Sequence, residues 1–178
     1  MTVVVLDLDE TLVHASSTRS PDFYSFPYAK LFVHVRPGAL GLLQLLHEDP
    51  DMEMCFWSAG TRPYVHHVCQ TLLDLAGLEA TTAMVLTRED ATEVTTNVFV
   101  KDLRKVDVRV KEGRRVLLLD DNPIHHMLCS HNRGRVIHVP PFEMRVEDDF
   151  LLELGRLFSR CGEDAPPEKM VAHVSSTA

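Results

Sequence analysis

The sequence lacks the long apolar runs, the excess of basic residues and the paired cysteines that mark several classes of protein. Its apolar stretches are far shorter than the roughly 20 residues that cross a bilayer, so we expect no membrane segment. A formal net charge of −8 argues against direct nucleic-acid binding, which depends on Lys and Arg that neutralise phosphates. The four cysteines form no Cys-x-x-Cys pair, which favours buried thiols in a reducing compartment.

The sequence also shows no signal peptide and no internal repeats. The first apolar run, Val3 to Leu6, meets Asp7 after four residues, too few for a signal peptide. We therefore expect an intracellular protein, nuclear or cytoplasmic, and a monomer. The length suits one domain, expected over residues 1–161, with a loosely held tail over residues 162–178 that contains two prolines.

The rest of the sequence alternates apolar strands with helical patterns. Strands are expected at 3–6, 31–35, 52–57, 116–119 and 136–139, and helices at 40–48, 63–77 and 147–158. This alternation predicts an α/β fold, a Rossmann-like sandwich with a parallel central sheet flanked by helices. Residues 15–27 are expected to form a loop, 83–86 and 95–100 a small β insertion in place of a large cap, and 101–115 a solvated basic helix.

Polar side chains follow the ends of separate strands. Asp7 and Asp9 follow the first strand, Ser58 another, and Asp120 and Asp121 the strand at 116–119. The carboxyl ends of parallel strands meet at one edge of a sheet, so we expect these groups to converge. Several carboxylates at one point predict a magnesium site, because Mg²⁺ prefers oxygen ligands.

Five segments in this order resemble the haloacid-dehalogenase superfamily. More narrowly, they resemble the small phosphatases of the RNA polymerase II C-terminal domain and their nuclear LIM interactor-interacting relatives. The segments are Asp7-Leu8-Asp9-Glu10-Thr11, Val35-Arg36-Pro37, Phe56-Trp57-Ser58-Ala59, Val100-Lys101-Asp102-Leu103 and Leu119-Asp120-Asp121-Asn122-Pro123. The resemblance runs from Val3 to about Phe158 and implies a HAD-like phosphatase fold.

The resemblance also implies roles for individual residues. Asp7 would attack phosphorus and form an aspartyl phosphate, and Asp9 would act as the general acid and base. Ser58 and Lys101 would clamp the phosphate, while Asp120 would orient Lys101 or a water. The Asp7 carboxylate, the Asp9 backbone carbonyl and Asp121 would bind Mg²⁺.

Substrate-side residues follow from the same resemblance. Thr11 would buttress the turn after Asp7, and Tyr64 and Arg88 would lie beside the substrate. Thr61 and Ser17 stand near positions where relatives have apolar residues, so we expect no apolar pocket for a substrate proline. Taken alone, Ser58 would be a helix cap, and the pairs His66-His67 and His125-His126 are not expected to chelate a metal.

An uncapped site favours a macromolecular substrate, because a small metabolite needs enclosure. We therefore expect a magnesium-dependent phosphatase acting on phosphoserine or phosphothreonine in a protein. Two alternatives remain open. One is a phosphatase of small molecules or of phosphotyrosine on the same scaffold. The other is a non-catalytic interaction module, which would be expected to have lost the catalytic acids that this chain retains.

Overall fold

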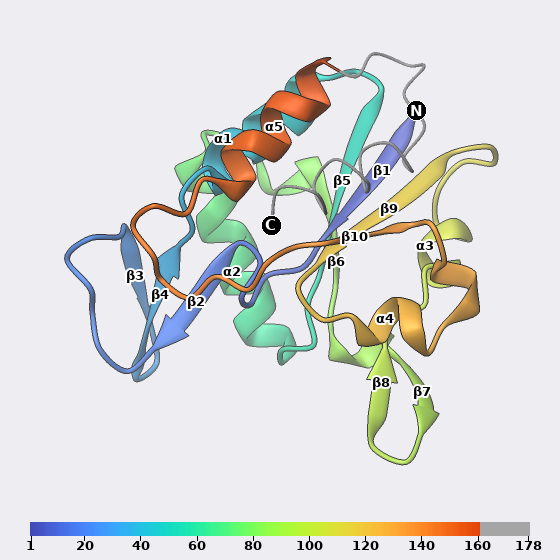
Figure 1. The fold of residues 1–178 in the computed structure, drawn as a ribbon, viewed down its shortest axis with the longest axis horizontal. Coiled ribbons are helices and arrows are strands. Elements are labelled where there is room, and N and C mark those ends of the chain that lie inside the picture. Colours follow the sequence, from blue (N-terminus) through green and yellow to red (C-terminus); the bar gives the residue numbers. More distant parts are fainter. Residues whose placement is uncertain (161–178) are drawn as a thin grey trace.

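The computed structural model describes residues 1–160 and confirms the α/β fold with a parallel central sheet. Five parallel strands lie in the order β10 (Val136–His138), β9 (Arg115–Asp120), β1 (Thr2–Leu6), β5 (Met52–Trp57) and β6 (Ala83–Leu86). In Figure 1 these strands run through the centre of the molecule. No large cap covers the sheet within residues 1–160, and none of their helices is long and apolar enough to cross a membrane. The expected tail and Cys161 lie outside the described residues.

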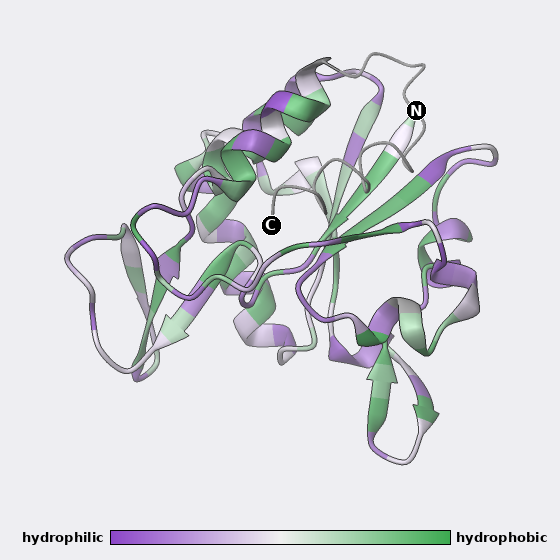
Figure 2. Ribbon diagram, viewed as in Figure 1, coloured by the Kyte–Doolittle hydropathy of each residue, from purple (hydrophilic) through white to green (hydrophobic). Residues whose placement is uncertain are grey.

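Both faces of the central sheet are covered, which explains the continuous apolar runs of its strands. Val4 and Leu6 face a core shared with α1 (Ala39–Glu48), α2 (Arg62–Leu75) and α5 (Phe150–Arg160). Val3 and Val5 point to the opposite core, which includes Val106 of the short helix α3 (Arg104–Asp107). In Figure 2 the central strands are mostly green, and the helices carry purple polar faces.

A second, antiparallel sheet takes in both ends of the segment that we predicted to be a loop. It has the order β2 (Val13–Ser16), β4 (Leu31–Val35) and β3 (Ser25–Tyr28). The loop prediction for 15–27 was therefore wrong for residues 15–16 and 25–27, whereas residues 17–24 lie in no strand or helix. Phe26 and Val33 are paired across β3 and β4 and are buried in the main core. Pro27 is tolerated because β3 is an edge strand.

The prediction for residues 83–115 was partly wrong. Residues 83–86 form β6, the edge strand of the central sheet, and do not belong to an insertion. The small insertion is the hairpin of β7 (Thr92–Thr95) and β8 (Val98–Val100), which projects from the body beside α4 (Ile124–Met127) in Figure 1. The expected basic helix shrinks to the four residues of α3. Short 3₁₀ helices lie at Ala80–Thr82, Arg88–Asp90 and Ser130–Asn132.

Buried Arg36 links the turn after β1 to the chain after β10. Its guanidinium donates hydrogen bonds to the carbonyls of Thr11 (3.1 Å) and Pro140 (2.9 Å) and pairs with Asp148 (2.9 Å). Gly38 lies close by with a positive φ of 81°, and a Cβ there would approach the backbone nitrogen of Leu152 to 2.8 Å. The Val35-Arg36-Pro37 motif therefore stabilises the fold, because Arg36 joins these two segments.

We expect Arg36→Met to destabilise the fold strongly. It would leave Asp148, whose side chain is only 11% exposed, without its cation, and breaking a buried ion pair costs about 3–5 kcal/mol. Urea unfolding followed by circular dichroism would measure the loss. Arg62→Met is the matched control, because Arg62 pairs with Glu89 at the surface, where both side chains are more than half exposed. Equal stability of the two variants would contradict this account of Arg36.

Candidate active site

Asp7 lies where β1 ends, in a turn whose backbone is fixed by hydrogen bonds. The Asp7 N–H donates to the carbonyl of Leu119 on β9 (3.0 Å), and the N–H groups of Thr11 and Val13 converge on the carbonyl of Leu8. The hydroxyl of buried Thr11 donates to Asp7 Oδ2 (3.3 Å). The turn thus holds Asp7 at the carboxyl edge of the central sheet, with Thr11 as its buttress.

Lys101 joins Asp7 to Asp120 in the interior. Its Nζ donates to Asp7 Oδ1 and to Asp120 Oδ2 (2.5 Å for Asp120), and the side chain is almost completely buried. Burial disfavours the ammonium, but the carboxylates of Asp7 and Asp120 outweigh it and raise the pKa of Lys101. Lys101 is therefore a fixed cation between two strand ends of the sheet.

The backbone of Lys101 is held by two side chains that were not predicted as site residues, His125 and Asn132. The Lys101 N–H donates to His125 Nδ1 (3.2 Å), and its carbonyl accepts from Asn132 Nδ2 (2.7 Å). Because Nδ1 accepts, the His125 proton lies on Nε2, which is 3.3 Å from Asp120 Oδ2. The sequence offered only the His125-His126 pair as a signal, which points to a metal and not to this supporting role.

Three carboxylates lie close together beside Lys101. Asp7, Asp120 and Asp121 each offer an oxygen within 4.8 Å of the others. Burial, opposed by Lys101, raises the pKa of Asp7, and burial together with Asp120 raises the pKa of Asp121. A divalent cation among these oxygens would offset the repulsion between the negatively charged carboxylates and keep them ionised. Three carboxylate ligands therefore fit Mg²⁺.

Asp9 has different partners. Its Oδ2 accepts from Ser58 Oγ (3.0 Å), and its Oδ1 accepts from the Tyr64 hydroxyl (2.5 Å). Burial and then Asp9 raise the pKa of Tyr64, so this hydroxyl stays a donor. Tyr64, predicted on the substrate side, therefore contacts Asp9 directly.

Ser58 does not cap helix α2. Its hydroxyl accepts from the N–H of Gly60 (2.9 Å), and Thr61 occupies the N-cap position without a side-chain hydrogen bond. The prediction that Ser58 caps the helix was therefore wrong, and the Ser58 hydroxyl donates its hydrogen bond to Asp9.

The three described cysteines are free and buried, as expected.

Arg88 lines two hollows that adjoin these groups. Its Nε donates to the carbonyl of Ala59 (2.6 Å), and both residues line both hollows. One hollow, of about 320 Å³, has Lys101 in its wall. The other, of about 500 Å³, borders Asp9. Arg88 thus lies outside the buried cluster but next to it.

The hollow beside Asp9 has partly apolar walls, although we expected no apolar pocket for a substrate proline. Ala15, Tyr28, Leu31 and Tyr64 supply apolar walls, although Thr61 is polar as noted from the sequence. Tyr28 and Tyr64 pack edge to face, with ring centroids 5.2 Å apart. These walls come largely from the antiparallel sheet that the sequence did not predict.

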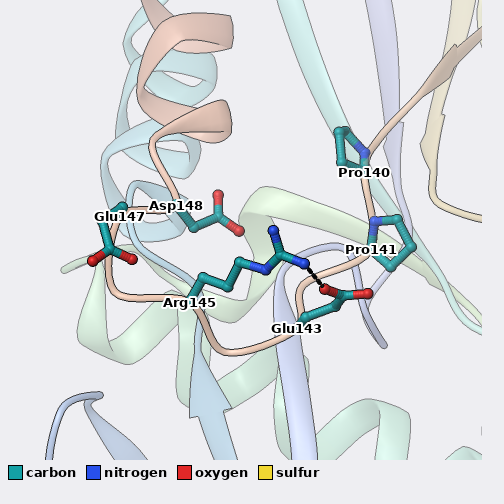
Figure 3. Close-up of a pocket in the computed structure, with 6 residues that line it drawn as sticks. All are labelled: Pro140, Pro141, Glu143, Arg145, Glu147 and Asp148. Atoms are coloured by element: carbon teal, nitrogen blue, oxygen red, sulfur yellow. Dashed lines mark hydrogen bonds and ion pairs between the residues drawn. The ribbon is translucent and has the colours of Figure 1, made fainter. Parts of the chain in front are cut away.

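A further hollow lies apart from these groups, in the segment after β10 (Figure 3). It measures about 510 Å³ and is lined by two prolines, three acids and one arginine: Pro140, Pro141, Glu143, Arg145, Glu147 and Asp148. Arg145 is paired with Glu143, and Asp148 is paired with Arg36. Because both arginines are engaged by carboxylates, this hollow is poorly suited to a phosphate ligand.

Comparison with known proteins shows that the chain is similar to phosphatases. The family described as NLI interacting factor-like phosphatase matches residues 2–166. No curated protein matches the chain. Two solved structures of Fcp1 share its fold: the fission yeast RNA polymerase II CTD phosphatase Fcp1 bound to beryllium fluoride (17% identity, TM-score 0.56) and Fcp1, an essential RNA polymerase II CTD phosphatase (18% identity, TM-score 0.56). Each comparison covers 98% of this chain but only 62% and 61% of those chains.

Proposed function

The chain belongs to the NLI interacting factor-like phosphatase family, and we propose that it is a magnesium-dependent phosphatase of phosphoserine and phosphothreonine in proteins. The observation that carries this proposal is the buried Asp7–Lys101–Asp120 arrangement, with Asp9 and Asp121 beside it. Family membership supports phosphate ester hydrolysis. The open hollows on both sides of the site support a peptide substrate, because a flanking side chain could enter each.

The proposed first step is attack of an Asp7 carboxylate oxygen on phosphorus. The new P–O bond forms as the bond to the serine or threonine oxygen breaks, and Asp9 gives its proton to that leaving oxygen. Lys101 offers its positive charge to the transferring oxygens, while Thr11 holds the other Asp7 oxygen. Asp9, now ionised, then takes a proton from a water whose oxygen attacks phosphorus. The bond between Asp7 and phosphorus breaks, which frees the Asp7 carboxylate and releases phosphate.

Ser58 and Tyr64 position Asp9 for both steps. Each donates to a different carboxylate oxygen, so they fix the orientation of the group while it exchanges its proton. Asp7, Asp121 and the Asp9 backbone carbonyl would hold Mg²⁺, which supplies charge neutralisation between the carboxylates and the phosphate. Asp120 keeps Lys101 in place through its short hydrogen bond.

Removal of magnesium is expected to abolish activity. The assay is phosphate release from a panel of phosphoserine, phosphothreonine and phosphotyrosine peptides and small phosphate esters, with Mg²⁺ and with excess chelator. Calcium should support turnover poorly, because its longer, looser coordination suits this compact donor set less well. Full activity in chelator after dialysis would contradict the metal requirement.

The same panel separates the alternatives. Preference for small esters or phosphotyrosine would replace the proposed substrate class, and absence of all turnover would favour a non-catalytic interaction module. We also expect a monomeric, nuclear or cytoplasmic protein, which size-exclusion chromatography and microscopy of a tagged chain would check.

A further inference from the structure

The hollow with Lys101 in its wall has an unusual combination of lining groups. Ala91, Phe99 and Val100, from the hairpin segment, make apolar walls, and Phe99 is about half exposed. Trp57, Arg88, Lys101 and His125 supply the polar side chains. Its volume of about 320 Å³ suits one side chain. We call it the tryptophan subsite.

Trp57, Arg88 and Lys101 bring only donors to this subsite, and the one ring acceptor of His125, Nδ1, already accepts from the Lys101 N–H. The Trp57 indole N–H is buried and has no acceptor among the residues that the structure describes. A buried donor without a partner is unfavourable, so a bound acceptor would be stabilised there. Arg88 contributes a guanidinium whose Nε is held by the Ala59 carbonyl, and no Asp or Glu lines the subsite.

The subsite adjoins the groups proposed to act on phosphate. Lys101 in its wall contacts Asp7, and Ala59 and Arg88 separate it from the hollow beside Asp9. A peptide whose phosphoresidue reaches Asp7 could therefore place a neighbouring side chain in the subsite. This reasoning rests on the proposed function.

We propose that the tryptophan subsite binds a glutamate side chain close to the phosphoresidue of the substrate. The methylene stem of the glutamate packs against Phe99 and Val100, and the carboxylate accepts from Trp57 and pairs with Arg88. A second phosphate is a poorer occupant, because a dianion loses more hydration between apolar walls. The enzyme would thus select acidic phosphopeptides on this side of the site.

The single tryptophan of the sequence makes the subsite directly observable. The test titrates the Asp7→Asn protein with phosphoserine peptides that carry glutamate or methionine at each of the two positions before and after the phosphoserine. At one position glutamate should bind roughly tenfold more tightly than methionine, from a hydrogen bond to a charged acceptor, and should shift the Trp57 emission. Equal affinities at all four positions, or glutamate preference with unchanged emission, would overturn the proposal.

Variants of the wild-type enzyme give a second measurement. Ala91→Leu fills the subsite and Trp57→Phe removes its donor, so each should reduce the glutamate-to-methionine ratio of kcat/KM to about one. Ala15→Leu, which fills the other hollow, is the matched control and should keep the ratio. If Trp57→Phe does not fold, Ala91→Leu decides. An unchanged ratio in Ala91→Leu refutes the subsite while turnover continues, whereas loss of the proposed function would show as no turnover of any peptide by the wild type.

Discussion

Phosphate release is expected to disappear when Asp7 is replaced by asparagine, whereas the fold should persist. A neutral amide cannot attack phosphorus, so no aspartyl phosphate can form. The amide has nearly the shape of the carboxylate, and its oxygen can still accept from Lys101. The Thr11 hydroxyl, which now donates to Asp7, can rotate and accept from the new NH₂ group. Steady-state phosphate release measures activity, and circular dichroism measures folding.

Asp22→Asn is the matched control, because Asp22 is an exposed acid outside the site and makes the same chemical change. This variant should keep wild-type turnover. A folded Asp7→Asn protein that still releases phosphate at a near-normal rate would show that another group attacks phosphorus. The assignment of Asp7 would then be wrong, although the acidic cluster could still bind metal.

The central sheet could be predicted because its strands carry their own signal. β1 and β9 are continuous apolar runs that end in acids, and both faces of the sheet are buried. β2 and β3 carry no such signal. They are short, rich in polar residues and, in β3, contain Pro27, so they are strands mainly because β4 lies between them. The place of β6 beside β5 depends on parallel pairing between distant segments, which local patterns cannot show.

In the site, too, some features could be predicted from local sequence patterns, and others depend on contacts between distant segments. Asp7, Asp9, Asp120 and Asp121 follow predicted strands, so their convergence could be expected before the geometry was known. The contact of Tyr64 with Asp9 joins residues 55 positions apart and depends on the angle at which α2 leaves the sheet. His125 supports the Lys101 backbone from a short helix. Contacts of this kind produce no periodic pattern in the sequence, so they could not be predicted from it.

Lys101→Ala is expected to lower kcat by at least about a hundredfold, the usual loss when one donor to transition-state charge is removed. In the proposed reaction, negative charge gathers on the equatorial oxygens of the transferring phosphoryl group, so a fixed cation acts most strongly there. The variant also leaves buried Asp120 without its cation. Thermal unfolding must therefore accompany the kinetics, with the exposed Lys111→Ala as the control for loss of one charge.

Arg88→Ala should behave differently, because Arg88 lies outside the buried cluster and is proposed to touch the peptide away from phosphorus. Binding lost equally from ground and transition states raises KM and leaves kcat unchanged. The comparison uses both variants on one phosphopeptide and on para-nitrophenyl phosphate, which has no peptide flanks. Lys101→Ala should impair both substrates through kcat, and Arg88→Ala should raise KM for the peptide alone. If Arg88→Ala lowers kcat equally for both, Arg88 acts on the phosphoryl group, and the division between clamp and peptide contact is wrong.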